Sequence, residues 1–345
     1  MLGQKCLTTL GHLLPTGGMA TGGSLSRMGV TSPPSPRLAA PPASQVEQAA
    51  IRAVAYADVF DYPLHAVEVH RYLHGTAATL EATEAALARC SAPGGALSHR
   101  EGCYTLPGRE SLVAVRHRRA AIASRLWPAA LTYARVIAGL PFVRMVAVTG
   151  SLAWNNVGDE GDIDYLIVTK PGRLWVCRWL IAALRRAALL DGVRLCPNYL
   201  ITTRALAFVD RSLYTAYEAA RMTPITGLGM YRRLRRANPW VEAYLPNAGN
   251  LPRAPEPSTS HRPHRVTTGL ARLARLAQRM LDLPPGALVE RLEMSYRIRK
   301  IELSGVASGE AAYGVDWFKG HAISHGRQIL AAFAERVRAL EAGAP

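Results

Sequence analysis

The stretch VTGSLAWNNVGDEGDIDYLIV, residues 148–168, places two aspartates at the start of an apolar run. Asp162 and Asp164 flank Ile163, and the apolar residues that follow are typical of a buried strand. Because residues two apart in a strand project from the same face, we expect the two carboxylates to lie together and Ile163 to face the core. Neighbouring carboxylates repel each other unless a cation lies between them, and such oxygen ligands suit Mg²⁺. The pattern therefore predicts a metal site.

Gly150 and Ser151 come before these aspartates, directly after the apolar run 143–149. We expect this run to be a strand and the Gly-Ser pair to be a turn that opens a helix. Backbone N–H groups at such a turn bind anions, and glycine allows a ligand to approach closely. The turn and the aspartates together predict a site for a nucleoside triphosphate and its metal ion. Taken singly, each feature is ordinary, because Asp-x-Asp is usually solvated and Gly-Ser is usually only a turn.

This order of Gly-Ser, a polar loop and Asp-x-Asp before apolar residues resembles the DNA polymerase beta-like nucleotidyltransferase superfamily. The resemblance covers residues 143–203 and implies an α/β (α+β) core of that type. It implies that Gly150 and Ser151 bind the nucleotide and that Asp162 and Asp164 are the catalytic, Mg²⁺-binding carboxylates. The implied reaction transfers a nucleoside monophosphate from an NTP to a hydroxyl of an unidentified acceptor, which is RNA, a protein or a small molecule.

Two positions depart from the family pattern. Active members usually have a third carboxylate on a later strand, and the strand expected at 194–202 has Asn198 at this possible third position. An amide carries no charge and is not a base, which weighs against ordinary two-metal catalysis. Gly161 also replaces a serine that often precedes the first aspartate. Three acidic residues near the later strand are candidate replacements for the third carboxylate: Asp191, Asp210 and Glu218.

A second function therefore stays open beside the enzymatic one. In this alternative, the chain is a non-catalytic regulatory protein that binds a nucleotide or nucleic acid through a degenerate nucleotidyltransferase site. A carboxylate that reaches the Asp162/Asp164 face favours catalysis, whereas Asn198 alone at that place favours binding.

The region before the core has its own pattern. Residues 1–44 are rich in Gly, Pro, Ser and Thr and contain no acidic residue, so we expect a disordered segment. Residues 45–110 predict three amphipathic helices and then a hairpin, which is the outline of a winged-helix-like domain. A small helical cap with a hairpin is the alternative. The FDYPL motif at 60–64 and the pair Asn198-Tyr199 resemble uncharacterised bacterial nucleotidyltransferase-domain proteins.

The remainder divides into three parts. The pattern of residues 111–246 predicts the α/β core, which begins with a long helix and has strands near 143–149, 162–168 and 195–202. An amphipathic helix is expected at 173–190, and its arginines exclude a membrane span. Residues 247–265 are rich in Pro, Ser and Asn and predict a linker. Residues 266–345 predict a basic, helical C-terminal region.

The charge of the chain indicates anionic partners. The formal net charge is +16 and the pI is about 10.1, which favours NTPs or nucleic acid; a general excess of arginine is the alternative. The cluster Arg116-His117-Arg118-Arg119 is a candidate nucleic-acid surface, and the competing interpretation is that it packs on the core. Five cysteines without a CxxC pair predict neither a zinc framework nor disulfides and favour the cytoplasm.

Two further groups of residues have patterns that fit a functional role. Lys170 and Arg173 follow the Asp-x-Asp strand and are candidates for phosphate contacts, although a solvated turn is the simpler interpretation. His321 and His325 have the spacing of half a metal site. With no third ligand nearby in the sequence, a surface pair is the simpler interpretation.

Overall fold

The computed structural model describes residues 41–342 except 160, 253, 257–260, 264, 277, 304–312 and 320–324. Residues from Ala40 onward form one compact unit. The segment predicted to be disordered, 1–44, lies outside the described residues except for its last four. Ala43 already begins the first helix, α1 (Ala43–Asp58), two residues before the predicted boundary.

The region predicted to be winged-helix-like contains the expected helices and hairpin, which are confirmed. The elements in chain order are α1, β1 (Leu64–His65), α2 (Ala66–Arg71), α3 (Leu80–Cys90), β2 (Ser98–Arg100) and β3 (Cys103–Thr105). Glu101 and Gly102 connect β2 to β3 with φ of 50° and 74°, as a tight two-residue hairpin turn requires. Strand β1 was not predicted; it pairs with β3 and gives the sheet order β1-β3-β2.

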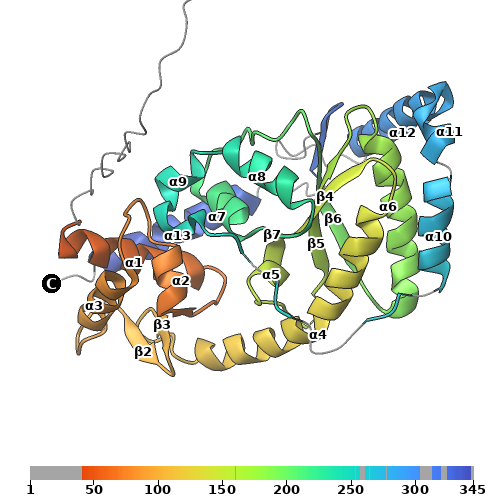
Figure 1. The fold of residues 1–345 in the computed structure, drawn as a ribbon. Coiled ribbons are helices and arrows are strands. Elements are labelled where there is room, and N and C mark those ends of the chain that lie inside the picture. Colours follow the sequence, from red (N-terminus) through yellow and green to blue (C-terminus); the bar gives the residue numbers. More distant parts are fainter. Residues whose placement is uncertain are drawn as a thin grey trace, which may run out of the picture. The chain divides into compact units, whose positions relative to one another are not determined.

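The core is a mixed five-stranded sheet, so the α/β expectation is confirmed (Figure 1). Its order is β7-β4-β5-β6-β8, and only β5 and β6 run parallel. The strands are β4 (Val143–Val148), β5 (Ile163–Thr169), β6 (Leu195–Thr202), β7 (Thr223–Thr226) and β8 (Trp317–Lys319). Helix α6 (Leu174–Ala188), followed by the short turn η1 (Leu189–Asp191), connects β5 to β6, because a parallel pair needs a crossover.

Strand β8 corrects the prediction of a purely helical C-terminal region. Four helices are present there among the described residues: α10 (Arg265–Leu276), α11 (Gln278–Asp282), α12 (Pro284–Leu303) and α13 (His325–Ala342). Between the last two, β8 pairs antiparallel with β6 at the edge of the core sheet. A strand of three residues is too short for its alternation to be recognised in the sequence.

The two faces of the sheet pack against different helices. Val146, Tyr165 and Ile167 cluster with α4 (Leu112–Ala138) and α6. Ala147, Leu166 and Val168 belong to a second cluster. That cluster includes α1 and residues of α7 (Leu213–Arg221), α8 (Leu228–Arg236) and α9 (Val241–Tyr244). Asp164 alternates with Leu166 and Val168, so it belongs to the second face.

The predicted linker, 247–265, is attached to the rest of the unit. It begins within the turn η2 (Pro246–Gly249), and α10 starts at its last residue. The Asn247 amide donates to the carbonyl oxygens of His70 and Ala78 at 2.9 and 3.1 Å, and Arg71 donates to the Asn250 carbonyl at 2.8 Å. Across the described parts of the chain, every helix is too short or too polar to traverse a lipid bilayer.

Candidate functional site

The two aspartates lie together, as predicted. Asp162 directly precedes β5 and Asp164 is its second residue. One ligand atom from each carboxyl group and the sulfur of Cys196 all lie within 4.8 Å of one another. Cys196 faces Asp164 because β5 and β6 are parallel and in register at this point. The sequence prediction missed Cys196, because the register between β5 and β6 that brings it to Asp164 is not evident from the sequence.

Gly150 lies against the Asp164 side chain. It follows β4 with a φ of +62°, and a Cβ placed on it would lie 2.0 Å from Asp164 Oδ2. The preceding residue, Thr149, donates its backbone N–H to the Asp164 carbonyl at 3.0 Å. Both the backbone conformation and the lack of space therefore require glycine at this position. Gly150 and the Asp164 side chain therefore lie in direct contact.

Ser151 lies in the first turn of α5 (Gly150–Ala153), a helix of only four residues. Such a short helix contributes little dipole, so an anion would be held mainly by its first N–H groups, which have no intrahelical partner. The Ser151 carbonyl accepts from Asn156 N at 2.9 Å and thereby closes the loop after the helix.

Asn198, the predicted third position, also reaches the aspartates. Its Nδ2 donates to Asp164 Oδ1, and its Oδ1 accepts from the Cys196 thiol at 2.7 Å. The register of β6 against β5 shifts just beyond Asp164, and such an irregularity redirects side chains locally. Cys196, Asn198 and Asp164 therefore form one hydrogen-bonded chain.

The environment of Asp164 disfavours its negative charge. Burial, followed by repulsion from Asp162 and Glu218, raises the pKa of Asp164 from 3.8 to about 8. Hydrogen bonds from Asn198 and Cys196 oppose this shift only in part. Burial and both aspartates likewise raise the pKa of Cys196 to about 12. A cation bound between the two carboxylates would relieve their repulsion.

Of the three candidate third carboxylates, Glu218 contributes to the electrostatics of Asp164. It lies on α7, where Arg221 Nη2 pairs with it at 2.7 Å. Asp191 accepts a hydrogen bond from the Tyr133 hydroxyl, on the side of the sheet that packs against α4. Asp210 accepts from Ser212 and Thr215 at the start of α7.

Gly161, which stands where the family often has serine, is also closely packed. A Cβ on Gly161 would lie 2.0 Å from Val157 Cγ1 and 3.1 Å from the Gly158 carbonyl oxygen. Val157 is fully buried. The loop before Asp162 therefore has no room for a side chain at this position.

Lys170 and Arg173 lie away from the aspartates. They follow the far end of β5, about 20 Å from Asp164 at roughly 3.3 Å per strand residue. Lys170 Nζ pairs with the Asp282 carboxylate at 3.0 Å, and Arg173 donates to the Asp282 carbonyl at 3.2 Å. They therefore bind α11 rather than the site. His321 lies outside the described residues, and His325 packs edge-on against Tyr214.

The basic cluster on α4 is partly engaged within the protein. Arg116 pairs with Glu68 at 2.8 Å and lies 4.4 Å from the centre of the Tyr62 ring. Arg119 donates to the Phe60 carbonyl at 3.0 Å and lies 3.7 Å from the Asp61 carboxylate. These contacts attach the FDYPL segment to α4, whereas Arg118 is exposed.

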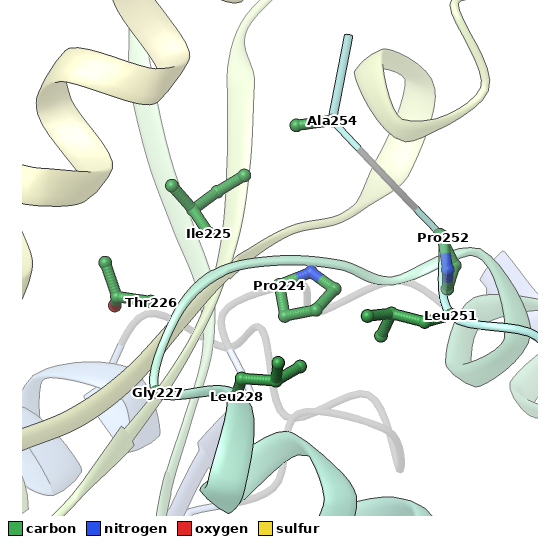
Figure 2. A pocket seen from close by; sticks show the side chains of 8 residues that line it. All are labelled: Pro224, Ile225, Thr226, Gly227, Leu228, Leu251, Pro252 and Ala254. Atoms are coloured by element: carbon green, nitrogen blue, oxygen red, sulfur yellow. The ribbon is translucent and has the colours of Figure 1, made fainter. Parts of the chain in front are cut away.

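An open cavity of about 380 Å³ lies along β7, at the edge of the core sheet (Figure 2). Its lining consists of Pro224, Ile225, Thr226, Gly227, Leu228, Leu251, Pro252 and Ala254. None of these side chains is titratable or binds metals strongly. The cavity therefore lacks groups for acid–base or metal chemistry, and the Asp162/Asp164 cluster is the better candidate site.

Comparisons of the chain with protein families, curated proteins and solved structures found no match. Two carboxylates, a thiol and an amide meet beside a glycine turn whose N–H groups suit an anion. The three donor atoms of Asp162, Asp164 and Cys196 are close enough together to hold a metal ion.

Proposed function

We propose that this protein is a Mg²⁺-dependent, polymerase-beta-like nucleotidyltransferase that transfers a nucleoside monophosphate from an NTP to an acceptor hydroxyl. The observation that carries the proposal is the contact of Gly150 with Asp164, beside Asp162. It places a glycine turn next to a pair of carboxylates that repel each other. Phosphoryl and nucleotidyl transfer depend mainly on such charge neutralisation and positioning.

Asp162 and Asp164 are the residues that would hold Mg²⁺, because carboxylate oxygens are its preferred protein ligands. When bound, the ion would neutralise the charge of the triphosphate. The N–H groups at Gly150 and Ser151 would orient the phosphates, and the missing side chain of Gly150 lets the Asp164 carboxylate lie directly against this turn. Asn198 would hold Asp164 in place through its amide. Glu218 is the remaining carboxylate that is able to accept a proton from the acceptor hydroxyl.

A second function is favoured by one specific observation. Asn198, and not a carboxylate, is hydrogen-bonded to Asp164 at the third position. A protein with this change would bind the nucleotide and metal as a sensor without transferring the nucleotide. The two functions differ in whether Glu218 is needed and in whether a carboxylate at position 198 increases the rate.

We also propose that the region from α1 to β3 is a winged-helix-like domain that selects an acceptor by binding nucleic acid. The order of helices and strands and the wing-like hairpin support this. Because Arg116 and Arg119 contact Glu68, Phe60 and Asp61, the exposed Arg118 is the member of the cluster best placed for phosphate contacts.

Calorimetric titration of NTPs, with and without Mg²⁺, tests the proposed function. We expect Mg²⁺-dependent binding that weakens at least about 100-fold in Asp162→Ala and Asp164→Ala, because each variant removes a metal ligand. Asp159→Ala is the matched control, since Asp159 is an exposed aspartate of the same loop. Equal NTP affinity in all four proteins, whether or not Mg²⁺ is present, would refute the proposal.

Transfer assays with labelled NTPs and cell extract separate the two functions. Catalysis predicts a labelled product that is lost in Glu218→Gln and enhanced in Asn198→Asp. Binding without catalysis predicts that the wild-type protein and Glu218→Gln bind NTP equally and label nothing. Labelled product in Asn198→Asp alone would show that the natural site lacks only the third carboxylate.

A further inference from the structure

Cys196 distinguishes this donor set from one made only of oxygen ligands. Its sulfur and one carboxylate oxygen from each of Asp162 and Asp164 all lie within 4.8 Å of one another. The three residues come from the adjacent starts of β5 and β6, so the hydrogen-bonded sheet fixes their separation. The sheet therefore holds the thiol at the site in the same way as it holds the carboxylates.

The type of metal depends on the type of ligand. Mg²⁺ takes oxygen ligands, in near-octahedral geometry, and retains bound water. Zn²⁺ takes thiolate and carboxylate ligands together, and three protein ligands with one open position are typical of its catalytic sites. A thiolate favours Zn²⁺ and its neighbours in the transition series, whereas carboxylates alone suit Mg²⁺.

Asn198 contacts both kinds of ligand. Its Oδ1 accepts from the Cys196 thiol at 2.7 Å, and its Nδ2 donates to Asp164 Oδ1. The bond to Asp164 orients that carboxylate, as the outer partners of metal ligands generally do. The bond from the thiol requires the thiol proton, so it holds Cys196 beside the aspartates until the sulfur binds a metal as thiolate.

We propose that Cys196 is a metal ligand of this site and makes it select Zn²⁺ over Mg²⁺. The inference rests on the proposed function, and it names Zn²⁺ in place of Mg²⁺ as the ion that the site binds more tightly. Mg²⁺ would bind through the two aspartates alone, whereas Zn²⁺ would bind through the aspartates and the Cys196 sulfur. The thiol proton passes to solvent when the sulfur–metal bond forms, and no oxidant or reductant takes part.

Co²⁺ provides a direct test, because it replaces Zn²⁺ and gives a sulfur-to-metal charge-transfer absorption when a thiolate binds it. The full chain would be titrated with Co²⁺, Zn²⁺ and Mg²⁺ by calorimetry, and with Co²⁺ in the near ultraviolet. We expect Cys196→Ser to lose the absorption and to bind Zn²⁺ and Co²⁺ at least about tenfold more weakly. Its Mg²⁺ affinity should change by less than about threefold, because Mg²⁺ does not depend on sulfur.

Two control variants complete the experiment. Cys90→Ser removes a thiol on α3 that is buried far from the site in the fold, and it should keep the absorption. Asp164→Asn removes a carboxylate that both metals use, and it should weaken Zn²⁺ and Mg²⁺ alike. Circular dichroism and thermal melting of each variant establish that it is folded.

The outcomes separate the inference from the proposed function. If Cys196→Ser binds Zn²⁺ and Co²⁺ as the wild type does, or if Co²⁺ gives no charge-transfer absorption, the inference is overturned. In that case Mg²⁺-dependent NTP binding that needs Asp164 would still uphold the function. If Cys196→Ser loses Co²⁺ but no NTP binds in any protein, the metal site stands and the nucleotidyltransferase function fails.

Discussion

Two buried or half-buried aspartates of this protein, Asp58 and Asp164, have opposite surroundings. Asp58 ends α1 and is 6% exposed, and its carboxylate pairs with Arg109 at 3.0 Å and with Arg336 of α13 at 2.7 Å. Asp164 lies next to Asp162, Cys196 and Asn198, and the pKa of Asp164 is raised to about 8. The first carboxylate is paired with arginines of the protein itself, whereas burial and repulsion from Asp162 favour the protonated form of the second.

This difference separates a structural charge from a functional one. A buried carboxylate that stabilises the fold brings its counter-charge with it, as Asp58 does by joining α1 to α13. A carboxylate without such a partner lowers stability, and proteins retain such groups mainly where they act on a ligand. Replacing aspartates by asparagine at matched sites therefore tests the assignment of the site.

The largest effect is expected for Asp58→Asn. Removing this charge leaves Arg109 and Arg336 without their shared carboxylate, and we expect the free energy of unfolding to fall by about 3 kcal/mol. Chemical denaturation measures it. Asp61→Asn is the control, because Asp61 is 44% exposed and pairs with Arg109 and Arg119 near the surface; it should cost less than about 1 kcal/mol. Equal losses in both variants would show that burial of the pair is unimportant.

Asp164→Asn should have the opposite sign. The folded protein retains the Asp164 proton at pH values where the unfolded chain, with a pKa near 3.8, has lost it. The free energy of unfolding of the wild type should therefore fall as the pH rises from about 4 to about 8. Without metal ions, we expect Asp164→Asn to be more stable than the wild type by about 2 kcal/mol at pH 9 and equally stable near pH 4.

Thermal melting between pH 4 and 9, in the presence of a chelator, checks this second prediction. A divalent cation should restore stability to the wild type above pH 8 and leave Asp164→Asn unchanged, because the cation binds only the native wild-type site. A variant that is less stable than the wild type at pH 9 would contradict the assignment of Asp164 as an uncompensated charge.

A smaller effect is expected from crowding the site at Gly150. Gly150 and Gly172 both have positive φ, of 62° and 68°, but a Cβ at Gly172 meets nothing within 4 Å. Both Gly→Ala variants therefore suffer the backbone penalty, and only Gly150→Ala also displaces the Asp164 side chain. We expect Gly150→Ala to cost about 1.5 kcal/mol more than Gly172→Ala in denaturant unfolding. It should also lose metal binding in calorimetry, whereas Gly172→Ala should bind metal normally.

The smallest effect concerns the arginines of α4. Arg116→Ala removes the contacts with Glu68 and Tyr62 and should lower the free energy of unfolding by about 1 kcal/mol. Arg118→Ala should change the free energy of unfolding by less than about 0.5 kcal/mol.

Gel-shift titrations with short duplexes and with tRNA test whether the arginines of α4 bind nucleic acid. We expect salt-sensitive binding that weakens in Arg118→Ala; binding that is absent at low salt would leave this region a structural cap.

Much of the core was predictable because its strands are long or strongly apolar. Strands β4, β5 and β6 and helix α6 occur where the sequence predicted them. The strands that were missed, β1, β7 and β8, contain two, four and three residues. Their pairing with β3, β4 and β6 depends on tertiary contacts, and no local periodicity indicates such short strands.

The site was predictable only to the extent that it follows from strand alternation. Because side chains alternate along a strand, Asp162 and Asp164 were predicted to lie on one face of the sheet. The glycine turn was predicted beside them, at the end of the neighbouring strand. Cys196 was missed because its position depends on the register between two strands, which the sequence does not state. The engagement of Arg116 by Glu68 was likewise invisible, since it depends on how α4 packs against α2.

The pairing of β8 with β6 also determines when the site strand becomes protected. During synthesis, β6 emerges with Cys196 and Asn198 more than a hundred residues before Trp317. Until β8 arrives, residues 199–201 present a free edge of N–H and C=O groups, of the kind that pairs with other chains. Over the same interval, Asp58 lacks Arg336, and the aromatic cluster around Tyr56 lacks Phe333. A nascent or proteolysed chain that stops before residue 317 would therefore carry all the residues of the candidate site and still be prone to aggregate.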